Sequence, residues 1–246
     1  KGDVVAGRID SGTTEFVWGM NPSSGSAWLT GGVGQYSSGH DVVLIDMDND
    51  SDLDIFCATF SGLYWVENYS IMPYTKVPFT SRKLLGPDFD DPTDTCAVDM
   101  DRDGDLDILG CGSTGKDPLI GWWENNGDLT DWPLHEISKS FSDPYRLDWG
   151  DMDNDGDVDV LCASKFNNSI AWWENSTTGF FYHNIDSDFS GASGIKAADM
   201  DRDGFLDIVA VAETANKVMW WQNDGVAANW TPYQIHAVAG DPAAVD

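Results

Sequence analysis

Apolar residues in this chain fall in short runs, nearly all of them bounded by Gly, Asn, Asp or Pro. Val, Ile and aromatic residues dominate the runs, and none has the length or the three-to-four-residue spacing that predicts a helix. Within residues 95–138 the pattern predicts four strands, at 95–100, 106–112, 120–125 and 133–138. The sequence therefore predicts an all-β protein.

One polar segment recurs four times between the apolar runs. It reads DMDNDSDLDI from Asp46, DMDRDGDLDI from Asp99, DMDNDGDVDV from Asp151 and DMDRDGFLDI from Asp199, so successive copies lie 53, 52 and 48 residues apart. The copies are followed in turn by YWVEN, WWEN, WWEN and WWQN, and then by a further apolar segment. The repeat thus spans the whole period, as in solenoids and propellers.

Four strands in a unit of about fifty residues are typical of one blade of a β-propeller. We predict a five-bladed β-propeller of four-stranded antiparallel blades that occupies residues 1–246 as a single domain. The repeat units are 3–45 together with 242–246, 46–98, 99–150, 151–198 and 199–241.

The two ends of the chain match complementary parts of a unit. Asp3 stands at the place of Asp107, and the apolar residues after it supply strands two to four of a blade, while residues 242–246 match a first strand. We expect these ends to pair and close the ring, because an open arc would expose two apolar blade faces. The alternative is an arc of a larger propeller, since a segment cut at repeat boundaries would have the same ends.

Composition and charge narrow the function classes. The chain has 246 residues, of which 41% are hydrophobic, and this content supports a folded core. A net charge of −29 argues against nucleic acid and anionic membranes as partners, because both are polyanions. We expect no membrane span, since no run of 18 apolar residues occurs. No CxxC pair occurs among the four cysteines, Cys57, Cys96, Cys111 and Cys162. The sequence does not decide whether Cys96 and Cys111 form a disulfide.

The recurring Asp segment has the spacing of an oxygen-ligand loop for a hard cation. Calcium takes six to eight oxygens, and a flexible loop can supply them from alternate side chains and one carbonyl. Counted from the first Asp, positions 1, 3, 5 and 9 are Asp in every copy. They are Asp46, Asp48, Asp50 and Asp54; Asp99, Asp101, Asp103 and Asp107; Asp151, Asp153, Asp155 and Asp159; and Asp199, Asp201, Asp203 and Asp207. Position 7 holds Asp52, Asp105, Asp157 and Phe205, so we expect a carbonyl ligand there.

Other cations and other loops fit less well. Magnesium keeps its waters, zinc requires Cys or His, and an EF-hand requires a Glu at position 12 and flanking helices. A solvated acidic face would not repeat ligand spacing four times. We therefore predict about four calcium ions, one in each loop. Ser51 replaces the turn Gly of the other copies, so the first loop should be the most strained.

The DxDxDGDxD segment followed by W[WV]EN resembles the FG-GAP or VCBS type of propeller repeat, found in integrin α-chain propellers and a calcium-containing fungal lectin. The resemblance covers essentially the whole chain. It implies calcium ligation by the loop residues and an extracellular or cell-surface location. The FG-GAP dipeptide itself is absent, which argues against an integrin-like ligand function.

No catalytic constellation is evident. The Trp pairs Trp122–Trp123, Trp172–Trp173 and Trp220–Trp221 recur, and adjacent strand residues face opposite sides of a blade, so we interpret them as core. His135, His183 and His236 also recur, at one expected position of the fourth strand, whereas a catalytic residue would more naturally occur once.

A specific ligand site should lie where the repeat is broken. Trp149 has no aromatic counterpart in the other first strands, and residues 70–94 form a long insertion. We predict a calcium-binding extracellular binding or adhesion module, part of a larger multidomain protein, with an extracellular protein or a glycan as its partner. The alternatives are a lectin with glycans held between blades, and a polysaccharide-active enzyme or its accessory domain.

Overall fold

The structure is a computed structural model that describes residues 4–10, 13–20, 29–36, 39–51, 53–59, 62–68, 79–83, 89, 91–113, 117–127 and 131–237. Within these ranges the chain forms nineteen strands and no helix. None of the described segments is therefore a helix long and apolar enough to cross a membrane.

The strands form five antiparallel sheets. The first sheet holds β1 (Val4–Asp10), β2 (Thr13–Met20) and β3 (Leu29–Tyr36). The second holds β4 (Gly39–Ile45), β5 (Asp54–Thr59), β6 (Gly62–Asn68) and β7 (Phe79–Lys83). The third holds β8 (Pro92–Val98), β9 (Asp107–Ser113), β10 (Pro118–Trp123) and β11 (Leu134–Ser138). The fourth holds β12 (Pro144–Gly150), β13 (Asp159–Ser164), β14 (Ser169–Ser176) and β15 (Gly179–Asp186), and the fifth β16 (Ala192–Ala198), β17 (Asp207–Ala212), β18 (Lys217–Asn223) and β19 (Trp230–Ala237).

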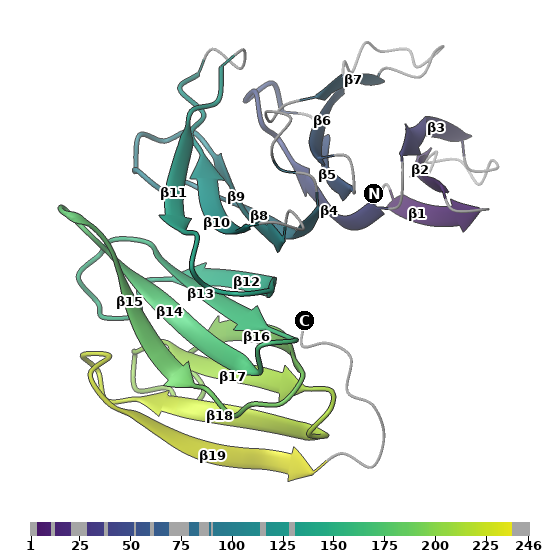
Figure 1. Ribbon diagram of the computed structural model, residues 1–246. Coiled ribbons are helices and arrows are strands. Elements are labelled where there is room, and N and C mark those ends of the chain that lie inside the picture. The colour runs from purple at the N-terminus through teal and green to yellow at the C-terminus, as the bar shows by residue number, and fades with distance from the viewer. Residues whose placement is uncertain are drawn as a thin grey trace.

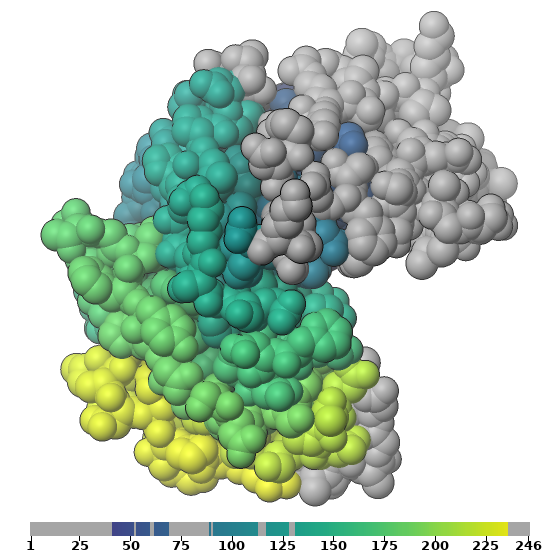
Figure 2. Space-filling view, viewed as in Figure 1, coloured from purple at the N-terminus to yellow at the C-terminus, as the bar shows by residue number. Residues whose placement is uncertain are grey.

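Each four-stranded sheet is a meander in which sequential strands are neighbours. The sheets follow one another around an arc, with the first strands β4, β8, β12 and β16 on its inner side and the fourth strands on its outer side (Figure 1). This is the arrangement of β-propeller blades. The surface over residues 131–237 is continuous from one blade to the next (Figure 2).

The predicted all-β class and four-stranded blades are confirmed. The four strands expected within residues 95–138 correspond to β8, β9, β10 and β11. The N-terminal sheet has three strands, in the order β1-β2-β3, as expected for strands two to four of a blade. Its predicted first strand, residues 242–246, lies outside the described residues, so ring closure remains a prediction.

The apolar core lies between neighbouring sheets. Because side chains alternate along a strand, the adjacent residues Ile108 and Leu109 of β9 enter two different apolar clusters, shared with the preceding and the following sheet. Trp172 and Trp173 of β14 are divided in the same way and are 1% and 2% exposed. Trp122–Trp123 and Trp172–Trp173 therefore hold their blades to both neighbours, which confirms their interpretation as core, whereas in the last blade Trp221 is buried and Trp220 is only half-buried.

The sheets and the repeat units are offset by one strand. Each sheet begins one strand before its Asp loop, so the repeat unit 46–98 supplies β5, β6 and β7 to one sheet and β8 to the next. The covalent chain therefore runs from the outer fourth strand of one blade to the inner first strand of the next, and each Asp loop follows that first strand.

Candidate metal centres in the Asp loops

Each Asp loop connects the first and second strands of a four-stranded sheet. Position 4 of the loop has a left-handed backbone in all four copies, with φ of 58° at Asn49, 64° at Arg102, 62° at Asn154 and 65° at Arg202. Position 6 is also left-handed, with φ of 95° to 100° at the three Gly residues and 74° at Ser51. The turn thus imposes a positive φ twice, and sequence reasoning identified only the second position.

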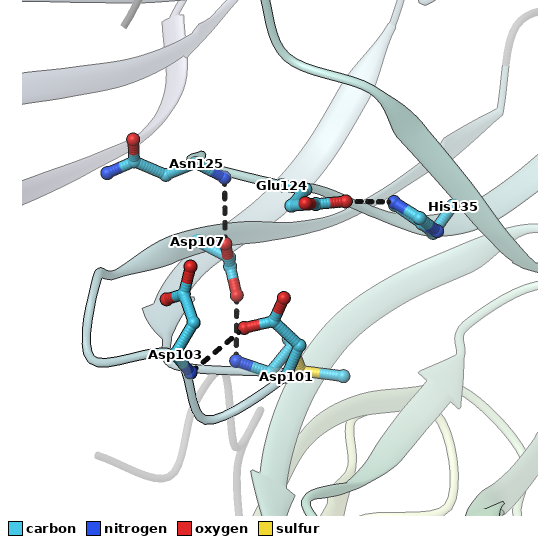
Figure 3. Close-up of polar contacts among 7 residues, drawn as sticks. Asp101, Asp103, Asp107, Glu124, Asn125 and His135 are labelled. Carbon is cyan, nitrogen blue, oxygen red and sulfur yellow. Dashed lines mark hydrogen bonds and ion pairs between the residues drawn. The ribbon is translucent and has the colours of Figure 1, made fainter. Parts of the chain in front are cut away.

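The Asp at position 9 fastens the loop to the rest of its blade. Asp107 is fully buried, and its Oδ2 and Oδ1 accept the N–H groups of Met100 and Asn125, each at 2.8 Å (Figure 3). The same two bonds form at Asp54, Asp159 and Asp207. The Asn is the last residue of the WWEN block, so the two repeated blocks meet at this carboxylate.

Three of these carboxylates are held in an environment that disfavours negative charge. Burial raises the pKa of Asp54 and Asp159 to about 7 and that of Asp107 to about 6, although the accepted N–H bonds act in the opposite direction. Burial, followed by the neighbouring carboxylate of Asp103, also raises the pKa of Asp101. A cation in the loop would remove this cost.

The structure brings together three carboxylates in each loop, with oxygens within 4.8 Å of one another. The groups are Asp46, Asp48 and Asp50; Asp99, Asp101 and Asp107; Asp151, Asp153 and Asp159; and Asp199, Asp201 and Asp203. Positions 1 and 3 take part in every group, joined by position 5 in the first and last loops and by position 9 in the middle two. Of the remaining expected ligands, Asp54 and Asp207 hold backbone N–H groups, Asp103 and Asp155 accept the N–H of position 7, and Asp52 lies outside the described residues.

Two of these groups contain an oxygen with unsatisfied bonding capacity. Asp99 Oδ1 and Asp151 Oδ1 are buried, and neither accepts a hydrogen bond from the described residues. A buried carboxylate oxygen without a donor costs on the order of 1–3 kcal/mol or more. The candidate metal ligands of both loops are all oxygen atoms. The residues therefore fit a hard divalent cation such as calcium and do not fit zinc.

The side chain at position 7 contacts the loop of the preceding blade. Arg102 Nη1 lies 3.2 Å from Asp157 Oδ1, and Asn49 Nδ2 donates to Asp105 Oδ1 at 3.2 Å. Phe205 in the last loop lies against Gly225 instead. Sequence reasoning missed this role; the polar residue at position 4 was the available signal.

A second repeated arrangement lies on the outer strands. His135 stacks on Trp122, with ring centroids 4.2 Å apart, and its Nε2 lies 2.6 Å from Glu124 Oε2 (Figure 3). His183 is placed in the same way on Trp172, against Glu174.

The last blade replaces this His–Glu pair. Tyr233 stacks on Trp220 and donates to Gln222, so Tyr takes the place of His where Gln takes the place of Glu. His236 lies opposite Val218 in the pairing register. The prediction that it shares the position of His135 and His183 is therefore wrong, because the register aligns Tyr233 with Trp220.

The four cysteines are free thiols. In the strand register Cys96 lies opposite Leu109, and Cys111 lies opposite Asp94. Cys96 and Cys111 therefore form no disulfide. Cys57, Cys111 and Cys162 are buried in strands β5, β9 and β13, and burial raises the pKa of Cys57 to about 12. We therefore still interpret the cysteines as small side chains that fill the core.

Trp149 and the insertion 70–94 are the two features of the sequence that break the repeat. Trp149 lies in β12 and is 40% exposed, on a strand of the inner side of the arc. Most of the insertion 70–94 lies outside the described residues. Neither feature is assigned a ligand by the geometry.

Comparison with solved structures places the chain among known folds. It is similar to a lectin from Agrocybe aegerita, whose structure is described as the basis of specific recognition of non-reducing terminal N-acetylglucosamine, with a TM-score of 0.61 and 17% identity over 97% of this chain and 67% of the lectin chain. At this identity the likeness shows the shared fold alone. The Tc holotoxin pore of Photorhabdus luminescens matches with a TM-score of 0.32 and 12% identity, over 95% of this chain and 15% of that chain.

Sequence comparisons identify the family. The search of curated proteins found no match. A family model described as FG-GAP-like repeat matches residues 46–110, 99–162 and 151–210, so its matches cover more than half of the chain and begin at three of the Asp loops. The family match supports the predicted FG-GAP-type repeat. The chain therefore belongs to the FG-GAP-like repeat family.

Proposed function

We propose that this chain is a calcium-stabilised β-propeller that serves as a binding module outside the cell. The observation that carries the calcium part is the fourfold grouping of carboxylates, in which Asp99 and Asp151 each keep a buried oxygen without a hydrogen-bond donor. Calcium would satisfy these oxygens and offset the repulsion within each loop.

The proposed ligand set follows the loop positions. Side chains at positions 1, 3 and 5 and the carbonyl at position 7 would bind the ion. Position 9 would contribute in the middle two loops, where Asp107 and Asp159 join the carboxylate groups. Four such loops imply about four ions, and the associated gain of positive charge suits a chain with a net charge of −29.

Metal analysis tests the calcium sites. The calcium-loaded protein should contain about four calcium ions per chain, and Asp99→Asn and Asp151→Asn should each remove about one. Asp188→Asn is the matched control, because Asp188 is an exposed carboxylate outside the loops and should leave the stoichiometry unchanged. A metal content near zero, or variants indistinguishable from the control, would refute the sites.

Chelation tests the structural role of the metal. Removing calcium with EGTA should lower Tm by roughly 10 °C or more, since several sites each favour the folded state by mass action. Calcium should restore the melting temperature and magnesium should not, because magnesium requires a small octahedral site and keeps its waters. A melting curve that chelation leaves in place would show that the loops are not structural calcium sites.

The extracellular location rests on the same chemistry. Extracellular calcium modules operate with dissociation constants of about 10⁻⁴–10⁻³ M, a range suited to exposed loops of this kind. We propose that the chain forms one propeller domain of a larger secreted or surface protein. Calcium titration provides the test, because submicromolar affinity would favour an intracellular sensor or buffer instead.

A glycan is the ligand class that the comparisons favour. The similar fold of the Agrocybe aegerita lectin supports it. A glycan array probed in calcium should show saturable binding to one class of sugar, and chelation should abolish it. Binding to an extracellular protein without glycan recognition would instead support the adhesion function.

A further inference from the structure

A cavity on the inner side of the arc is separate from the Asp loops. It has a volume of about 340 Å³ and is lined by residues of the first strands β4, β8, β12 and β16. Its charged lining residues are Asp41, Asp94, Arg146, Asp148 and Lys196. Small-molecule sites have volumes of about 300–1,000 Å³, so the cavity is large enough for a small ligand.

The three carboxylates of the cavity connect consecutive inner strands. Asp41 Oδ2 accepts the Thr95 N–H at 3.2 Å and hydroxyl at 3.0 Å, and Asp94 Oδ2 accepts the Leu147 N–H at 2.7 Å. Asp148 Oδ2 likewise accepts an N–H from the next strand, at 2.7 Å. These bonds fix the carboxylates in place.

The guanidinium of Arg146 is fixed without a carboxylate partner. Nη1 donates to the carbonyls of Thr93 at 3.0 Å and Tyr145 at 2.8 Å, and the group lies over the Tyr145 ring at 4.3 Å. Among the described residues it forms no ion pair, so its other N–H groups retain bonding capacity. Lys196 Nζ lies 3.5 Å from Asp148 Oδ1 and remains 42% exposed.

The charges in the cavity are only partly balanced. Burial, followed by the carboxylate of Asp41, raises the pKa of Asp94 to about 7, while Arg146 and Lys196 act to lower it. A cationic group placed beside Asp94 would reduce this cost, and an anionic group beside Arg146 would use the remaining donors.

We propose that this cavity binds a small zwitterion, with its ammonium group at Asp94 and Asp41 and its carboxylate at Arg146 and Lys196. A free amino acid has both groups at a suitable size. An amine or a carboxylate alone would leave the opposite charge of the cavity without a partner. This site is distinct from the calcium loops and from the proposed glycan function.

Calorimetric titration of the calcium-loaded full chain with individual L-amino acids tests the proposal. At least one should bind saturably at one site per chain, and ethylamine and acetate should bind about tenfold more weakly or not at all. Asp94→Asn and Arg146→Gln should each weaken the binding by about tenfold or more. Asp188→Asn, which removes an exposed carboxylate outside the cavity, should leave it unchanged.

Three outcomes would overturn the proposal. They are no amino acid binding below about 10 mM, equal binding of ethylamine or acetate, and binding that persists in both cavity variants. Lys196→Gln provides a further variant in case the others do not fold. Because Lys196 is partly exposed, this substitution should weaken carboxylate recognition without disturbing the core. Calcium content is measured in the same samples. A loss of amino-acid binding at unchanged calcium content then concerns the cavity and not the calcium sites.

Discussion

Ser51 illustrates how one residue can depart from a repeated design. It occupies the loop position that is Gly in the other three copies, with φ of 74°, where a Cβ is unfavourable. The backbone of the loop is nevertheless retained, because Asp46 accepts the N–H groups of Asp50 and Ser51. The hydrogen bonds to Asp46 thus impose the unfavourable positive φ on Ser51, in the loop where the sequence predicts strain.

Replacing Ser51 by Gly should therefore stabilise the protein. We expect Ser51→Gly to raise the free energy of unfolding by about 0.5–1 kcal/mol, measured by denaturant unfolding in calcium. Ser187→Gly is the control, because exposed Ser187 has no positive φ and its replacement should be neutral or destabilising. Equal effects of the two substitutions would contradict the assignment of strain.

The half-buried carboxyl group of Asp94 predicts a pH dependence. Its pKa is raised from 3.8 to about 7, so the folded protein carries a cost for the charged form that is absent below about pH 4 and complete above about pH 7. Asp94→Asn removes the charge and keeps an acceptor for the Leu147 N–H.

The difference in Tm between Asp94→Asn and the parent protein should accordingly become more favourable to the variant between pH 5 and pH 8. The corresponding change in the free energy of unfolding is on the order of 1 kcal/mol. Thermal melts in calcium at both pH values measure it, with exposed Asp188→Asn as a control that should show no such trend. A difference that stays constant across this interval would refute the raised pKa.

At the scale of the element, the WWEN block connects a blade to its Asp loop and to the neighbouring blade. The Asn223 backbone N–H bonds Asp207, and its Nδ2 donates to Leu206 O at 2.9 Å and to Met152 O of the preceding loop at 2.7 Å. The equivalent Asn175 uses its backbone N–H alone within the described residues. Equivalent residues of the repeat therefore differ in what their side chains contribute.

This difference can be measured with two matched substitutions. Asn223→Ala should lower the free energy of unfolding by about 2 kcal/mol or more. It removes the donor to the Met152 and Leu206 carbonyls and the acceptor of two N–H groups in the following turn. Asn175→Ala should cost about 0.5 kcal/mol or less, because its side chain makes no such bonds. Similar losses in the two variants would show that the inter-blade bonds of Asn223 add little.

At the scale of the whole molecule, the blades form a chain of nearest-neighbour contacts. Three apolar clusters each join two consecutive sheets, and each inner strand from β4 to β12 offers an Asp to the next. Propellers gain further stability when the last blade pairs with the first. Residues 242–246 are the segment predicted to make that closure.

Truncation tests the closure directly. If residues 242–246 provide the first strand of the N-terminal blade, a chain ending at residue 241 should lose several degrees in Tm relative to the chain ending at 246, because a whole edge would become unpaired. A control that keeps the length but replaces Ala243 and Val245 by Asp should lose about as much. If neither change lowers Tm, the arc of a larger propeller becomes the better description.

The sequence by itself determined the features that repeat. The short strands and the Asp loops recur four times at a period of about fifty residues, and the paired Trp residues recur three times. Local patterns that repeat in this way can be recognised from the sequence. The need for a left-handed residue at loop position 6 was also readable from Gly, although the same need at Asn49, Arg102, Asn154 and Arg202 was not.

Only the tertiary structure decided which residues of different repeats meet. The pairing of Arg102 with Asp157, the alignment of Tyr233 with Trp220 and the charged cavity around Asp94 depend on strand register and on how consecutive blades pack. Contacts of this kind join positions about one repeat or more apart, or depend on a single bulge that shifts the register, and neither leaves a local pattern. The loops followed from periodicity, whereas the charged cavity around Asp94 follows from the packing of strands β4, β8, β12 and β16.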